Sequence, residues 1–138
     1  MAPLDSTAVL RSPVLILLAG FLLHTATCKP NTAVSSVLCN SGTYTKGDPF
    51  AASLAAVLAD LESVAPSRPG YDFRNISPYP NAFAYGHAAC NRSLSASDCA
   101  ACLAAAKTAV IGGCDARIGG RALLIDCNVR YEQYPFDD

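Results

Sequence analysis

The sequence has no surplus of charge of either sign and no motif for a catalytic nucleophile. Its 10 Lys and Arg side chains stand against 11 Asp and Glu, which gives a net charge of −1. A chain without a basic surplus generates no field that attracts nucleic acid or anionic lipid. A Gly-x-Ser-x-Gly motif is absent, as are internal repeats and low-complexity segments. We therefore expect no nucleic-acid partner, no catalytic residues and no repeat architecture.

An apolar run near the N-terminus predicts a secretory signal peptide. Residues 13–23 are apolar, Arg11 precedes them, and mostly small residues lead up to Cys28. This order of basic residue, short apolar stretch and small-residue exit is typical of a signal peptide. The run is shorter than the ~20 apolar residues that cross a bilayer as a helix. An N-terminal core helix is the alternative, but the segment has no polar face to show to water.

Cleavage after Cys28 changes the cysteine count from odd to even. Residues 1–28 are then the signal peptide, and residues 29–138 form a single domain of about 110 residues with no membrane span. In the oxidising secretory route the remaining cysteines form disulfides, and three bridges of about 2–4 kcal/mol each stabilise a small core. The six cysteines are Cys39, Cys90, Cys99, Cys102, Cys114 and Cys127.

Two helices have clear start and stop signals. Asp48 can cap the first, Pro49 suits its first position, and apolar residues recur at helical spacing before Pro66. Ser95 can cap the second, which continues to Gly112-Gly113. Helical spacing places one set of residues of the second helix on a single face: Cys99, Cys102, Leu103, Ala106 and Val110.

Strand patterns occupy residues 31–39, 71–73, 82–90 and 121–132. The last stretch is the strongest, with Cys127, Val129 and Tyr131 alternating on one side. The opposite side carries Asn128, Arg130 and Glu132. We expect a loop over residues 75–81 and a turn at Gly119-Gly120. This mixed order of elements predicts an α+β fold with two helices packed on an antiparallel sheet of about five strands and three disulfides.

The most specific pattern in the chain is Cys90-x8-Cys99-x2-Cys102. A zinc site needs a second ligand pair, and the other cysteines are scattered, with His87 the only histidine after residue 28. A redox dithiol needs a βαβ context that is missing. We expect a disulfide framework without metal or cofactor, although the spacing alone does not choose among fifteen pairings.

This pattern, followed by Cys114 and Cys127, resembles the plant cysteine-rich secretory domain, also called the stress-antifungal or ginkbilobin-like domain. The resemblance covers nearly all of residues 29–138. Its further motifs are Asn31-Thr32-Ala33, Asp48-Pro49-Phe50, Leu58-Ala59-Asp60-Leu61, Gly70-Tyr71-Asp72, Ala84-Tyr85-Gly86, Ser97-Asp98-Cys99, Asp126-Cys127 and Tyr131-Glu132-Gln133. The resemblance implies the disulfides Cys39–Cys114, Cys90–Cys99 and Cys102–Cys127.

The resemblance also implies a mannose-binding set of Asn40, Arg121 and Glu132. Together an amide, a guanidinium and a carboxylate can pair with sugar hydroxyls that both donate and accept. Each residue has an ordinary interpretation beside this one: Asn40 can end a strand, and Arg121 with Glu132 can form a surface ion pair.

The leading hypothesis is a non-catalytic, monomeric lectin secreted to the apoplast, which binds mannose or fungal wall mannan in antifungal defence. The alternative is an apoplastic protein-interaction or signalling module that binds no sugar. An enzyme is a third class that no motif supports. Two smaller expectations are glycosylation at the sequon Asn91-Arg92-Ser93 and a solvated tail at Asp137-Asp138.

Overall fold

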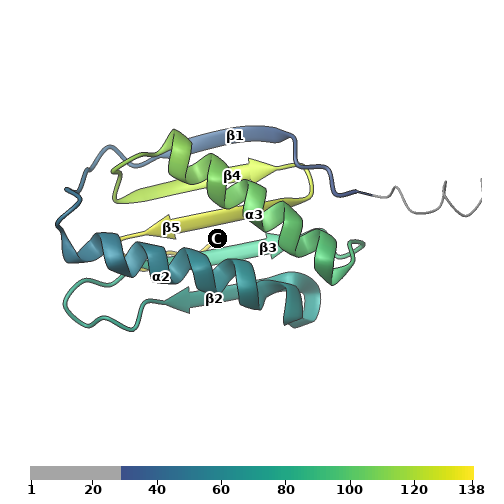
Figure 1. Cartoon of the computed structure of the whole chain (residues 1–138), viewed down its shortest axis with the longest axis horizontal. Helices are drawn as coiled ribbons and strands as arrows, with labels where there is room; N and C mark the ends of the chain where they lie inside the picture. Colours follow the sequence, from purple (N-terminus) through teal and green to yellow (C-terminus); the bar gives the residue numbers. More distant parts are fainter. Residues whose placement is uncertain (1–28) are drawn as a thin grey trace, which may run out of the picture.

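Residues 29–138 are described by a computed structural model, so the predicted signal peptide and Cys28 lie outside the described residues. The fold is one five-stranded antiparallel sheet with two helices on one of its faces (Figure 1). The strand order is β1-β4-β5-β3-β2. The elements are β1 (Val34–Cys39), α2 (Pro49–Val64), short 3-10 turns at Ala65–Ser67 and Pro69–Tyr71, β2 (Asp72–Ile76), β3 (Tyr85–Cys90), α3 (Ala96–Gly113), β4 (Gly119–Leu124) and β5 (Cys127–Glu132). The predicted α+β fold is confirmed.

Both helices begin at the predicted capping residues. The Asp48 carboxylate accepts a hydrogen bond from the Phe50 backbone N–H at 2.9 Å, and Pro49 takes the first helical position of α2. The Ser95 hydroxyl accepts from the Asp98 N–H at 3.1 Å at the start of α3. These side chains satisfy backbone donors that have no partner within the helix.

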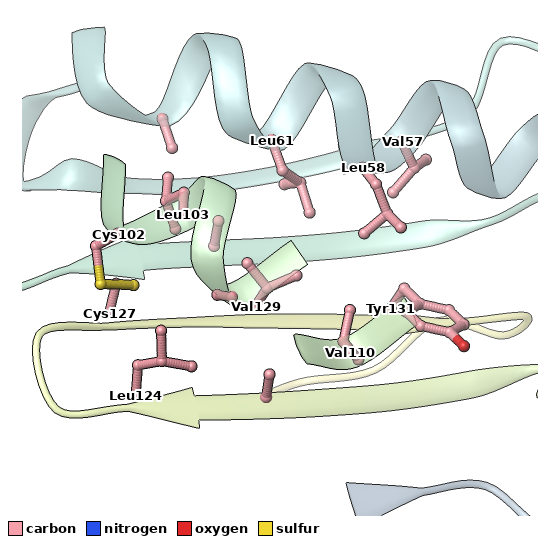
Figure 2. Close-up of a cluster of buried hydrophobic side chains, with 14 of the residues drawn as sticks. Val57, Leu58, Leu61, Cys102, Leu103, Val110, Leu124, Cys127, Val129 and Tyr131 are labelled. Atoms are coloured by element: carbon pink, nitrogen blue, oxygen red, sulfur yellow. A yellow bond between two sulfur atoms is a disulfide. The ribbon is translucent and has the colours of Figure 1, made fainter. Parts of the chain in front are cut away.

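The core lies between the helices and one face of the sheet (Figure 2). Ala88, Val129 and Ala122 pair directly across β3, β5 and β4 and are all buried beneath the helices. Because successive strand residues point to opposite faces, the next row along the strands faces away from the helices. That helix-free face carries the polar residues discussed below.

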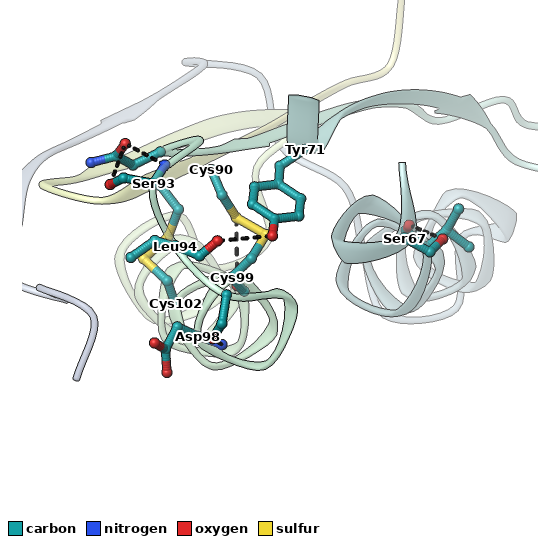
Figure 3. The surroundings of a disulfide bond; sticks show 12 residues. Ser67, Tyr71, Cys90, Ser93, Leu94, Asp98, Cys99 and Cys102 are labelled. Atoms are coloured by element: carbon teal, nitrogen blue, oxygen red, sulfur yellow. Dashed lines mark hydrogen bonds between the residues drawn. A yellow bond between two sulfur atoms is a disulfide. The ribbon is translucent and has the colours of Figure 1, made fainter. Parts of the chain in front are cut away.

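Three disulfides attach α3 to three different strands. They are Cys39–Cys114, Cys90–Cys99 and Cys102–Cys127, the pairs that the family resemblance implied. Around the second bridge, the Tyr71 hydroxyl donates a 2.8 Å hydrogen bond to the Leu94 carbonyl (Figure 3). All six cysteines of residues 29–138 are therefore bonded in pairs, and Cys99 and Cys102 have different partners.

Helix α2, with the 3-10 turn that follows it, is long and apolar enough by composition to cross a membrane. Its residues Phe50, Leu54, Val57, Leu58 and Leu61 are buried against the sheet. Burial against the sheet accounts for its apolar composition as the core helix of a domain.

The predicted single strand over residues 121–132 is wrong. The segment forms two strands, β4 and β5, that pair with each other, and Gly119-Gly120 belongs to β4 rather than to a turn. The reversal lies at Ile125 and Asp126. The Asp126 carboxylate accepts from the Asn31 N–H at 2.6 Å, and its carbonyl accepts from the Asn91 N–H at 2.8 Å. These bonds hold the turn against the rest of the chain.

The strand predicted at residues 71–73 is longer than expected. Asn75 and Ile76, expected in a loop, continue β2 and pair with Gly86 and Tyr85 of β3. The Asn75 side chain donates to the Val57 carbonyl of α2 at 3.1 Å. A tertiary hydrogen bond therefore supports a residue whose own preference is for turns.

Candidate functional site

Asn40, Arg121 and Glu132 line one pocket on the helix-free side of the sheet. The pocket has a volume of about 320 Å³, and its other lining residues are Leu38, Cys39, Arg130 and Tyr134. Asn40 directly follows β1, Arg121 lies in β4, and Glu132 is the last residue of β5. They meet because β4 lies between β1 and β5, which places the end of β5 next to the end of β1.

Asn40 is held in place by its own backbone and side chain. Its N–H donates to the Gly119 carbonyl at 2.9 Å, and its carbonyl accepts from the Arg117 guanidinium at 3.0 Å. Its side-chain oxygen accepts from the Gly42 N–H at 2.9 Å, which is the turn role that Asn commonly has. The amide nitrogen makes only a 3.4 Å contact to the Tyr134 hydroxyl, so it retains donor capacity toward the pocket.

Glu132 is buried, with 7% of its surface exposed. One carboxylate oxygen, Oε1, accepts from Arg130 Nε at 3.4 Å. The other, Oε2, is buried without a hydrogen-bond partner among the described residues. Gly119 lies opposite Glu132, and a Cβ built there would come within 1.7 Å of Oε2. The absence of a side chain at Gly119 is therefore what makes room for the carboxylate.

Arg121 is partly exposed and forms an ion pair with Asp138. The interpretation of Arg121 and Glu132 as an ion pair is therefore wrong, because Glu132 pairs with Arg130. The tail residues Asp137 and Asp138 are exposed, as expected, but the side chain of Asp138 also contacts several basic groups. The tail folds back onto the sheet, so its last residue finds partners that composition alone does not reveal.

Sequence reasoning missed two residues that line the pocket with hydrogen-bonding side chains, Arg130 and Tyr134. Strand alternation put Arg130 on the same face as Glu132, which was a usable signal. Tyr134 follows the last strand and carries no comparable pattern. Among residues 29–138 no group of three His, Cys, Asp or Glu side chains is placed to hold a metal ion.

The sequon asparagine Asn91 lies in the turn after β3 and is exposed. Its side-chain oxygen accepts from the Ser93 N–H at 3.1 Å and from the Ser93 hydroxyl at 3.0 Å. Glycosylation of Asn91 stays a prediction that the mass of the secreted protein would test.

Comparison with known proteins gives the family of this fold and pocket. Residues 38–134 match the family described as salt stress response/antifungal, a range that includes all three predicted sugar-binding residues and all six disulfide cysteines. The chain belongs to this family. The family assignment agrees with the resemblance read from the cysteine spacing.

Relatives from two seed plants align over most of the chain. It is 36% identical to antifungal protein ginkbilobin-like protein 1 of Picea glauca, over 96% of this chain and 93% of that one. It is 40% identical to antifungal protein ginkbilobin-2 of Ginkgo biloba, over 77% of this chain and 80% of that one.

A solved structure shares the fold. It is the tandem DUF26 ectodomain of the Arabidopsis thaliana cysteine-rich receptor-like protein PDLP5, with a TM-score of 0.68 and 18% identity. The match covers 75% of this chain and 51% of that ectodomain, so this chain spans about half of the tandem structure. At this identity the likeness shows the fold alone.

Proposed function

We propose that this protein is a secreted plant antifungal defence protein that binds mannose units of fungal wall mannan without catalysing a reaction. The observation that carries the proposal is the convergence of Asn40, Arg121 and Glu132 on one pocket. The buried, unpartnered Oε2 of Glu132 adds to it, because such an oxygen is costly unless a donor reaches it. The names of the aligned relatives from Picea glauca and Ginkgo biloba support the antifungal part.

The three side chains match the hydrogen-bonding needs of a hexose. A sugar hydroxyl can donate to the Glu132 carboxylate, accept from the Arg121 guanidinium, and do either with the Asn40 amide. Polar groups on both sides must lose water before they pair, so affinity for a single sugar is expected to be weak. Clustered mannose units on a polymer would raise the effective affinity by multivalency.

Secretion is supported by three features. Residues 1–28 have the pattern of a signal peptide, and all six cysteines of the described domain are bonded, as in proteins that mature in an oxidising compartment. A relative from Arabidopsis thaliana is named cysteine-rich repeat secretory protein 55. The apoplast is the compartment that these features favour.

A protein-interaction module is the second candidate, and the edge strand β1 favours it. Among residues 29–138 this strand pairs only with β4, so within the described domain its outer backbone edge is available to another chain. Val34 and Leu38 on it are more than half exposed. A partner that adds a strand there would bind without any sugar.

Binding of the oxidised protein to immobilised mannan, with free mannose as competitor, separates the two candidates. We expect binding by the wild type that mannose displaces, and its loss in Arg121→Ala and in the triple variant Asn40→Ala/Arg121→Ala/Glu132→Ala. Arg121→Ala is the cleaner variant, since a partly exposed ion pair contributes only ~0–1 kcal/mol to folding stability.

Asn128→Ala is the matched control, because Asn128 lies on the same face of β5 but outside the pocket. It should bind mannan like the wild type. If the folded wild type does not bind mannan, the protein-interaction module that uses the edge strand β1 becomes the favoured candidate.

A further inference from the structure

Four basic residues form one row across the helix-free face of the sheet. Arg74 on β2 pairs with His87 on β3, His87 with Arg130 on β5, and Arg130 with Arg121 on β4. Residues paired directly across antiparallel strands point to the same face. The three arginines and the histidine are therefore neighbours, although they lie far apart in the sequence.

A row of neighbouring positive charges lowers the stability of the sheet unless an anion binds to it. Like charges directly opposite each other destabilise a sheet, and Arg121 and Arg130 are such a pair. Two carboxylates flank the row from its own strands: Glu132 contacts Arg130, and Asp72 contacts His87 Nε2 at 2.8 Å. Neither carboxylate contacts Arg74 or Arg121, so the positive charges of these two arginines remain to be balanced by another acidic group.

The chain's own Asp138 carboxylate occupies the centre of the row. Its Oδ1 lies 3.5 Å from the Arg130 guanidinium, 3.7 Å from that of Arg74 and 3.8 Å from His87 Nδ1. Its other oxygen pairs with Arg121. Figure 1 shows the C-terminus over the middle of the sheet, next to β5 and β3. One acidic group thus contacts all four basic residues.

His87 supplies a second observation that points to a ligand. It is more than nine-tenths buried, and its Nε2 is bonded to Asp72. Its Nδ1 is buried and has no hydrogen-bond partner among the described residues, and the nearest acidic oxygen is that of Asp138 at 3.8 Å. A buried ring nitrogen without a partner is left to meet a polar group that is not part of the sheet.

We infer that Arg74, His87, Arg130 and Arg121 form an oxyanion-binding site for a phosphate group carried on a sugar, and that Asp138 occupies this site when no ligand is bound. Guanidinium groups pair bidentately with phosphate, and three of them can serve several oxygens at once. Arg121 and Arg130 also line the candidate sugar pocket, so the site adjoins it. The sugar part of this inference rests on the proposed function, whereas the oxyanion site does not.

Calorimetric titration with mannose, mannose 6-phosphate and inorganic phosphate, at constant ionic strength, tests the inference. We expect mannose 6-phosphate to bind about tenfold or more tightly than mannose, since hydrogen bonds between charged groups are the stronger class. Arg74→Gln should lower the affinity for mannose 6-phosphate to that for mannose. It should leave mannose binding unchanged, because Arg74 does not line the sugar pocket.

Asp138→Asn should tighten binding of both phosphate ligands by removing the internal competitor. Lys107→Gln is the control for net charge, because Lys107 lies on α3 and pairs with Glu62 away from this face. Equal affinity for mannose and mannose 6-phosphate would overturn the oxyanion site and leave the sugar site standing.

Phosphate binding without mannose binding would support the oxyanion site and contradict the proposed sugar function. If Lys107→Gln and Arg74→Gln lose phosphate binding equally, the loss comes from the change in net charge alone, and the site is overturned. The site would also be overturned if neither the wild type nor Asp138→Asn bound any phosphate ligand. Inorganic phosphate that binds as tightly as mannose 6-phosphate would identify free phosphate, rather than a sugar phosphate, as the ligand.

Discussion

At the scale of single residues, the place of Glu132 depends on Gly119, which does not line the pocket. Gly119 lies opposite Glu132, and any side chain there would take the space of Oε2. In Gly119→Ala we expect the carboxylate to rotate away, because it is the flexible end of a side chain. Mannan binding should fall to the level of a Glu132→Ala variant, while the thermal midpoint stays close to that of the wild type.

Gly47→Ala is the matched control, since a Cβ at Gly47 meets no atom within 4 Å. It should leave mannan binding unchanged. Mannan binding by Gly119→Ala at the wild-type level would show that the position of Glu132 does not matter for recognition.

Tyr131 links the core to the loop that presents Asn40. Its hydroxyl donates to the Arg117 carbonyl at 3.0 Å, and the Arg117 guanidinium donates to the Asn40 carbonyl. Burial raises the pKa of the Tyr131 phenol above its ordinary value of about 10. Above that pH the unfolded state loses the phenol proton while the folded state keeps it, so stability falls as pH rises.

Tyr131→Phe should therefore be less stable by about 1 kcal/mol at pH 7, through loss of the hydrogen bond. Above pH 10 its stability should fall less steeply than that of the wild type, by up to about 1.4 kcal/mol per pH unit. Urea unfolding at a series of pH values measures both effects. Parallel curves for the two proteins above pH 10 would contradict the assignment to Tyr131.

Sequence reasoning reached part of the site at this scale. Asn40, Arg121 and Glu132 sit in motifs that the family resemblance identified, and they line one pocket. The role of Asp138 could not be predicted, because it depends on a tail that folds back over the sheet and reaches residues of four strands. The basic row could not be predicted either, since it requires the register of four strands.

At the scale of elements, the helices were predictable from local chemistry and the C-terminal hairpin was not. A capping side chain and helical spacing are properties of neighbouring residues, so Asp48 and Ser95 marked both helix starts. The β4–β5 turn has no glycine or proline. Ile125 in this turn is apolar, so the strand pattern in the sequence continues through the reversal, although the side chain is 59% exposed. Contacts from distant residues Asn31 and Asn91 to Asp126 define that turn.

Removal of the α3 cap should have a measurable cost. In Ser95→Ala the Asp98 N–H loses its acceptor, and we expect a loss of about 1 kcal/mol in the free energy of unfolding. Ser95→Asp keeps a capping oxygen and should stay near the wild type. Urea unfolding at pH 7 measures both variants. A Ser95→Ala variant as stable as the wild type would mean that the disulfides alone fix the start of α3.

At the scale of the whole molecule, the disulfides connect α3 to three strands in bridges of very different span. The paired cysteines are 75 residues apart in Cys39–Cys114, 25 in Cys102–Cys127 and 9 in Cys90–Cys99. A bridge that closes a longer loop restricts the unfolded chain more. The long bridge also ties down β1, which lies at the edge of the sheet and, in the described part of the chain, has β4 as its only neighbouring strand.

Replacing each pair of cysteines by alanine should therefore destabilise the protein unequally. From the entropy of loop closure we expect the free energy of unfolding to fall by about 4.5 kcal/mol in Cys39→Ala/Cys114→Ala and by about 2.6 kcal/mol in Cys90→Ala/Cys99→Ala. Denaturant unfolding of the oxidised variants gives both values. Hydrogen exchange should show early loss of protection in β1 only for the first variant, since its remaining bridges hold β3 and β5. If the two losses are equal, strain or residual structure in the unfolded chain, rather than loop length, sets the contribution of each bridge.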